Sequence, residues 1–161
     1  MPTVLTCGVY GFTAESFEKA ITGAGLDVFV DVRRRRGVRG SQYSFANSQR
    51  LQDMLKKHDI TYVHDIDLAP TESMVKHEGE IDHEHHIARH DRDSLSEDFV
   101  AAYRKEVLDD FDAKAFIKSL GDVKRVLLFC VERTPSACHR GLLADKIENE
   151  LGWEREDLVP E

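Results

Sequence analysis

The N-terminal part of the chain switches between two hydrophobic periods, and this switch limits the folds open to it. Residues 3–7 are rich in β-branched and apolar side chains, and residues 26–32 form a second run of the same kind. Between them, residues 13–22 carry Phe17 and Ile21 at the spacing of a helix. A strand, a helix and a strand in this order predict a βαβ unit with parallel strands.

The same alternation continues toward the C-terminus. It predicts further strands at 60–64 and 123–130, and further helices from Ser48 and at 94–107, 113–120 and 140–151. Capping residues mark several helix ends: Thr13, Ser94 with Glu97, Asp112 and Gly152. We therefore predict a single α/β domain over residues 1–161, with a mainly parallel sheet and helices on both faces. The stretch 71–93, rich in histidine and acidic residues, is predicted to be a surface loop or insertion.

Composition narrows the protein's class and partners. The chain has 161 residues, 41% of them hydrophobic, which suffices for one domain with its own core. The net charge of −8 gives no general attraction to nucleic acid or anionic membranes, so any such contact needs a local patch. No apolar run approaches the roughly 20 residues that span a bilayer, and no secretory signal is visible, so we expect a cytoplasmic protein without membrane contact. Three cysteines in such a chain favour free thiols or a metal site over disulfides.

Polar residues follow each predicted strand. Ligands of parallel α/β sheets bind beside the carboxyl ends of the strands. Just beyond the last predicted strand, Cys138, His139 and Arg140 open a helix, whose N-terminus attracts anions. We predict a strand-end cleft that binds an anionic ligand, phosphate-bearing or nucleotide-like. Its predicted ligand-binding residues are Tyr10, Arg33, His64 and Arg140, and its predicted catalytic residues are Asp31, Cys130, Glu132, Cys138 and His139.

Several motifs occur together: a glycine turn at 8–11, Val30-Asp31-Val32-Arg33, Phe45-Ala46-Asn47, Ile60-Thr61-Tyr62-Val63-His64, Leu68-Ala69-Pro70, Cys130-Val131-Glu132 and Cys138-His139-Arg140. Over nearly its whole length, the chain with these motifs resembles the family called domain of unknown function 488. The resemblance implies a shared constellation of Asp31, Arg33, Cys130, Glu132, Cys138, His139 and Arg140, and assigns it no reaction. The four consecutive arginines and the histidine-rich stretch are departures from the family's pattern.

The cysteines allow two interpretations. If the protein is an enzyme, a thiol-dependent hydrolase or transferase is the reaction class, with Cys138 or Cys130 as nucleophile, His139 as acid or base and Arg140 as anion clamp. Alternatively, both thiols only pack in the core. Tyrosine-phosphatase chemistry at Cys130 does not fit, because Ser136 stands where that loop needs an arginine. A persulfide carrier of the rhodanese type stays open.

The two carboxylates are also ambiguous. Asp31 and Glu132 could act as an acid and base pair, or could hold Arg33 and Arg140 in fixed rotamers.

A second function class comes from the arginine run. Residues 33–36 with Arg39, followed by Gln42, Tyr43 and Phe45, combine cations with aromatic rings, as nucleic-acid surfaces do. The alternative to an enzyme is therefore a non-enzymatic nucleic-acid or nucleotide-binding module, and the simplest alternative to both is a solvated basic loop.

No dedicated metal site is predicted, and the cofactor and oligomeric state stay open. The histidines in 71–93 match no zinc-binding spacing and indicate incidental metal affinity: His77, His83, His85, His86 and His90. A zinc site of Cys130, Cys138 and His139 with Cys7 is not predicted, since it needs strand-end geometry that the sequence does not specify.

Overall fold

Five parallel strands form the centre of the molecule. The computed structural model describes residues 2–38, 40–84, 95–132 and 138–160. The strand order is β3-β2-β4-β1-β5, and every neighbouring pair is parallel. The strands are β1 (Thr3–Cys7), β2 (Val28–Asp31), β3 (Thr61–His64), β4 (Arg125–Phe129) and β5 (Glu154–Leu158). The predicted α/β domain with its parallel sheet is confirmed.

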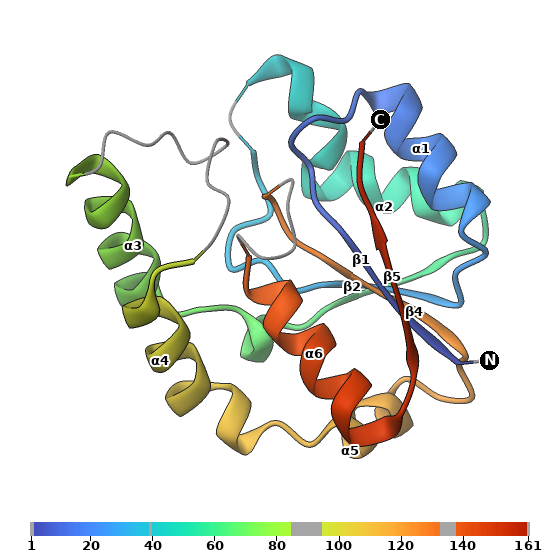
Figure 1. The fold of residues 1–161 in the computed structure, drawn as a ribbon. Coiled ribbons are helices and arrows are strands. Elements are labelled where there is room, and N and C mark those ends of the chain that lie inside the picture. The colour runs from blue at the N-terminus through green and yellow to red at the C-terminus, as the bar shows by residue number, and fades with distance from the viewer. Residues whose placement is uncertain (1, 39, 85–94, 133–137, 161) are drawn as a thin grey trace.

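Helices cover both faces of this sheet (Figure 1). The α-helices are α1 (Ala14–Gly23), α2 (Ser48–Lys57), α3 (Glu72–Glu84), α4 (Glu97–Glu106), α5 (Ala113–Ser119) and α6 (His139–Leu151). Short 3-10 helices are η1 (Ser41–Ala46), η2 (Ile66–Leu68) and η4 (Leu108–Asp110). None of the helices in the described part of the chain combines the length and the apolar character that crossing a bilayer requires.

The core is divided into two layers by the sheet. On the first, which we call the α1 face, Phe17 and Ile21 of α1 and Leu51 of α2 pack under the strands. On the second, the α6 face, Tyr103 of α4 and Leu143 of α6 do the same. Each fully buried side chain of this kind stabilises the fold by about 1.5–3 kcal/mol. Because successive strand residues point to opposite faces, the parity of a residue decides which layer its side chain joins.

Two predictions for residues 71–107 need correction. Residues Glu72–Glu84 form helix α3 rather than a surface loop, because Met74 and Glu78, four residues apart, are both buried on one side of it. The Glu78 carboxylate accepts a hydrogen bond from the Ser96 amide at 2.9 Å. Helix α4 begins at Glu97 with Ser96 as its N-cap, not at the predicted residue 94. Ser94 and the remainder of the histidine-rich stretch, 85–93, lie outside the described residues.

Strand β5 was not predicted, because its residues are mostly charged. It pairs with β1 along its whole length at one edge of the sheet. The Thr6 hydroxyl donates to the Asp157 carboxylate at 2.5 Å, so polar contacts replace apolar packing here. The other edge strand is β3.

Candidate functional site

The predicted site residues leave the strand ends on opposite faces of the sheet. Cys7 lies opposite Phe129 in the β1–β4 register, and both side chains belong to the α1 face. Cys130, one residue further, packs on the α6 face together with Cys138. The strand-end constellation is therefore two separate groups, and Cys7 does not join the other two thiols.

On the α6 face, two sulfurs meet one imidazole nitrogen. The Sγ atoms of Cys130 and Cys138 lie 3.7 and 3.6 Å from Nδ1 of His139. The other ring nitrogen, Nε2, lies 2.8 Å from the carbonyl oxygen of Val32. Since a carbonyl only accepts, Nε2 carries a proton, and in the neutral ring the lone pair of Nδ1 faces both sulfurs.

The start of α6 places these groups. Cys138 is the N-cap of the helix, in extended conformation, and His139 is the first helical residue. The free amides of a helix N-terminus favour negative charge, such as that of a thiolate. All three side chains are buried, with Cys138 only 2% exposed.

This environment shifts the pKa values of the two thiols in opposite directions. Burial acts to raise the pKa of Cys138, but the hydrogen bond from Cys130 and the charges of the two residues after Cys138 hold that pKa well below its ordinary value. Burial and the neighbouring sulfur raise the pKa of Cys130 well above its ordinary value. Burial opposes protonation of His139, yet the Cys138 sulfur raises its pKa above the usual one. Of the pair, Cys138 is therefore the thiol that ionises first.

Arg140 closes the segment that follows β4. Its Nη1 donates to the carbonyl oxygen of Glu132 at 2.6 Å, and the side chain is fully buried. Gly8 passes so close to the same carbonyl that a Cβ there would lie 1.8 Å from the oxygen. The guanidinium that we predicted to clamp an anion thus also holds the backbone of this turn.

On the α1 face, Asp31 and Arg33 form a buried ion pair. Nε and Nη2 of Arg33 each donate to the Asp31 carboxylate at 2.8 Å, and Nη1 donates to the Ala46 carbonyl at 2.9 Å. The guanidinium also stacks on the Phe129 ring, 4.8 Å from its centre. The Tyr62 hydroxyl donates to Asp31 at 2.7 Å. Asp31 therefore holds Arg33 in a fixed rotamer, the second of the two roles that the sequence left open.

Two further predicted ligand-binding residues, Tyr10 and His64, are half-buried and contact other parts of the protein. Tyr10 is half-buried and packs edge-on against Tyr43, with ring centres 5.2 Å apart. Nε2 of His64 donates to the carbonyl of Arg33 at 2.8 Å, so this histidine supports the end of β2.

Tyr103 is a neighbour of the site that sequence reasoning missed. Its ring centre lies 5.4 Å from that of His139, and its hydroxyl donates to the Leu68 carbonyl at 2.6 Å. In the sequence it is one aromatic residue on the apolar side of a helix, which gives no sign of a role at the site.

The side chains of the arginine run point in different directions, because several of them contact other parts of the protein. Arg34 donates to the carbonyl of Pro70 at 2.6 Å, and the exposed Arg35 lies 3.4 Å from Glu72. With Arg33 turned inward, the run does not present four cations on one surface. Arg39 lies outside the described residues.

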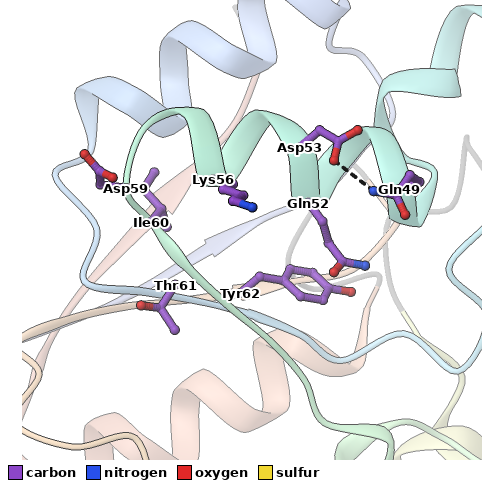
Figure 2. A pocket seen from close by; sticks show the side chains of 8 residues that line it. All are labelled: Gln49, Gln52, Asp53, Lys56, Asp59, Ile60, Thr61 and Tyr62. Carbon is purple, nitrogen blue, oxygen red and sulfur yellow. Dashed lines mark hydrogen bonds between the residues drawn. The ribbon is translucent and has the colours of Figure 1, made fainter.

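A separate hollow of about 550 Å³ opens between α2 and β3. Figure 2 shows its mostly polar lining, in which Gln49 donates a hydrogen bond to Asp53 on α2 and Tyr62 extends from β3. None of the predicted site residues lines it. One lining residue, Tyr62, connects it to the candidate residues, because the Tyr62 hydroxyl donates to Asp31.

The sulfur and imidazole atoms could also hold a metal. One ligand atom each from Cys130, Cys138 and His139 lies within 4.8 Å of the other two. Over the ranges that the structure describes, no fourth Cys, His, Asp or Glu joins this group.

Comparison with known proteins shows the family to which this chain belongs. A family model described as Domain of unknown function DUF488 matches residues 13–147. The chain belongs to this family. No curated protein and no solved structure matches it. The matched DUF488 region includes both groups at the strand ends, the ion pair of Asp31 and Arg33 and the three side chains around Nδ1 of His139.

Proposed function

We propose that this protein is a thiol-dependent hydrolase or transferase that acts on an anionic substrate at the α6 face of the strand ends. The observation that carries the proposal is the position of the Cys138 sulfur, 3.6 Å from an imidazole nitrogen whose partner nitrogen is anchored to Val32. A nucleophile beside a base that a third group orients is the recurring arrangement of covalent catalysis.

In the proposed reaction, the Cys138 sulfur bonds to the electrophilic carbon or phosphorus of the substrate. The thiol proton passes to Nδ1 of His139 and then to the departing group. Water cleaves the resulting thioester or thiophosphate in a hydrolase, and an acceptor molecule does so in a transferase. The buried Glu132 contributes through its charge, which helps to raise the pKa of His139 and so favours the imidazolium that this proton transfer forms.

The preference for a negative substrate is supported by local charge. Cys138 caps the N-terminus of α6, a helix that runs to Leu151, and the buried Arg140 is its second residue. A helix N-terminus and a guanidinium both stabilise an anion. The ion pair with Asp31 leaves Arg33 no part in this proposal.

The test uses reduced, metal-free protein and follows iodoacetamide labelling of each cysteine by mass spectrometry, with and without inorganic phosphate. Cys138 should be labelled first and should be protected by phosphate, whereas Cys7 on the other face should stay unlabelled until the protein unfolds. Hydrolysis of p-nitrophenyl acetate and p-nitrophenyl phosphate supplies the activity readout. Cys138→Ser should lower it by at least about 100-fold, and Cys7→Ser should not.

Two results would overturn this proposal. One is that all three thiols stay unlabelled in the folded protein with either addition. The other is that Cys138→Ser and Cys7→Ser hydrolyse both esters equally well. The nucleic-acid module that the sequence left open has no specific observation in its favour, because Arg33 and Arg34 bond to the protein itself.

A further inference from the structure

The three ligand atoms at the strand ends are spaced like the corners of a metal site. A zinc ion bound about 2.3 Å from sulfur and about 2.0–2.1 Å from nitrogen, at a tetrahedral angle, separates those two ligands by about 3.6 Å. The observed separations from Nδ1 of His139 are 3.7 Å to the Cys130 sulfur and 3.6 Å to the Cys138 sulfur. Two of the three edges that join these ligand atoms therefore already have the length that a tetrahedral zinc site requires, and the third, between the sulfurs, is at most 4.8 Å.

The histidine is held as a metal ligand usually is. A ligating imidazole almost always donates its second ring nitrogen to a carbonyl or carboxylate, which orients the ring. Nε2 of His139 does this with the Val32 carbonyl at 2.8 Å, and the Tyr103 ring packs against the imidazole. These contacts point the lone pair of Nδ1 at the space between the sulfurs.

We infer that Cys130, Cys138 and His139 bind one divalent cation of the zinc class, an inference that goes beyond the proposed thiol chemistry. Thiolate and imidazole ligands select zinc and exclude magnesium and calcium, which require oxygen. A dication also neutralises two thiolates in a buried place, where unpaired charges are costly. Three protein ligands leave a fourth position for water or an anion.

Metal binding changes the reactivity of both thiols. A bound cation occupies both sulfurs and the lone pair of Nδ1, so Cys138 in the metal-bound protein is no longer a free nucleophile. Metal and alkylating reagent therefore compete for the same atoms. One equivalent of zinc should therefore abolish most of the iodoacetamide labelling of Cys138.

The first experiment titrates reduced, metal-free protein with Co²⁺ under argon and records its absorbance. One cobalt per chain, a sulfur-to-cobalt charge-transfer band and the intense visible bands of tetrahedral cobalt are expected, and Zn²⁺ should abolish all of them. X-ray absorption of the zinc form should show two sulfurs at about 2.3 Å and one nitrogen at about 2.0–2.1 Å. This measurement uses the wild-type chain, so it does not depend on the folding of any variant.

Variants locate the site. Cys130→Ser and Cys138→Ser should lose the charge-transfer band and bind cobalt at least about tenfold more weakly. Cys7→Ser is the matched control, because it makes the same change in a buried thiol on the α1 face. Circular dichroism checks the folding of all three.

Cobalt or zinc surrounded by nitrogen and oxygen alone would overturn the inference and place the metal on the histidine-rich stretch. Binding that is unchanged in both α6-face cysteine variants would overturn it as well. None of these readouts uses a substrate. A failure to bind metal therefore leaves the proposed thiol chemistry standing, and unreactive Cys138 in metal-free protein contradicts that chemistry alone.

Discussion

Gly8 should tolerate no side chain, because the chain crosses the carbonyl group of Glu132 at this position. A Cβ on Gly8 would lie 1.8 Å from the carbonyl oxygen and 2.8 Å from the carbonyl carbon. An ordinary contact begins at 3.4 Å, so Gly8→Ala requires the two backbones to separate by about 1.6 Å, which is 3.4 minus 1.8. The obstacle is backbone, so no change of rotamer removes it.

The cost follows from what holds the two segments together. Three backbone hydrogen bonds of 2.8–3.1 Å join residues 7–10 to residues 130–131. Each contributes about 0.5–1.5 kcal/mol net, so the loss of all three in Gly8→Ala should lower the free energy of unfolding by about 1.5–4.5 kcal/mol. For a domain of this size the corresponding fall in Tm is about 3–18 °C.

Urea unfolding, followed by circular dichroism, measures the effect. Gly23→Ala is the control, because nothing lies within 4 Å of a Cβ at the end of α1, and this change should be neutral or stabilising by up to about 1 kcal/mol. If Gly8→Ala unfolds at the same urea concentration as the wild type, with the same slope, the close approach of these two backbones is refuted.

Three further predictions concern how buried or hydrogen-bonded ionisable side chains affect stability. Asp31→Asn leaves the Arg33 cation buried without its partner and should destabilise the protein by about 3–5 kcal/mol. Arg35→Gln breaks an exposed ion pair with Glu72 and should change the free energy of unfolding by under about 0.5 kcal/mol. Urea unfolding of both variants measures the difference. Burial raises the pKa of Cys7 to about 12, so stability should fall as the pH rises from 9 toward 12, and Cys7→Ala should reduce that fall. Hydrogen bonds from two backbone amides lower the pKa of Asp27, so its stabilising effect should be complete above the ordinary carboxyl pKa and disappear on acidification; Asp27→Asn should unfold less steeply with acid.

Most of the fold was predicted from the spacing of hydrophobic residues. The prediction failed for two elements, α3 and β5, in which charged residues obscure that spacing. Strands β1, β2 and β4 are buried on both faces, as central parallel strands are, and were therefore readable from the sequence. Strand β5 is an edge strand of charged residues, held by pairing with β1 and by polar contacts. Helix α3 was missed because Gly79 and a high density of charge obscure the two buried positions, Met74 and Glu78.

The site was predictable only in part, for a related reason. Parallel strands bring their carboxyl ends to one edge, so the gathering of Asp31, Cys130 and the start of α6 could be expected. The face that each side chain takes depends on the register between strands, such as Cys7 opposite Phe129, and on β2 lying beside β4. The sequence alone gives neither the register between strands nor the strand order. The contact between His139 and the Val32 carbonyl depends on both.

The two groups at the strand ends remain joined through the backbone of residues 31–33. The Asp31 carboxylate accepts from the Arg33 amide at 3.2 Å on the α1 face. One residue earlier, the Val32 carbonyl accepts from His139 at 2.8 Å on the α6 face. Loss of the ion pair should therefore loosen the group that orients the imidazole. Asp31→Asn should weaken cobalt binding and slow Cys138 labelling, although it touches neither sulfur, and Arg35→Gln should change neither. If Asp31→Asn folds and binds cobalt as the wild type does, the backbone of residues 31–33 does not couple the two faces.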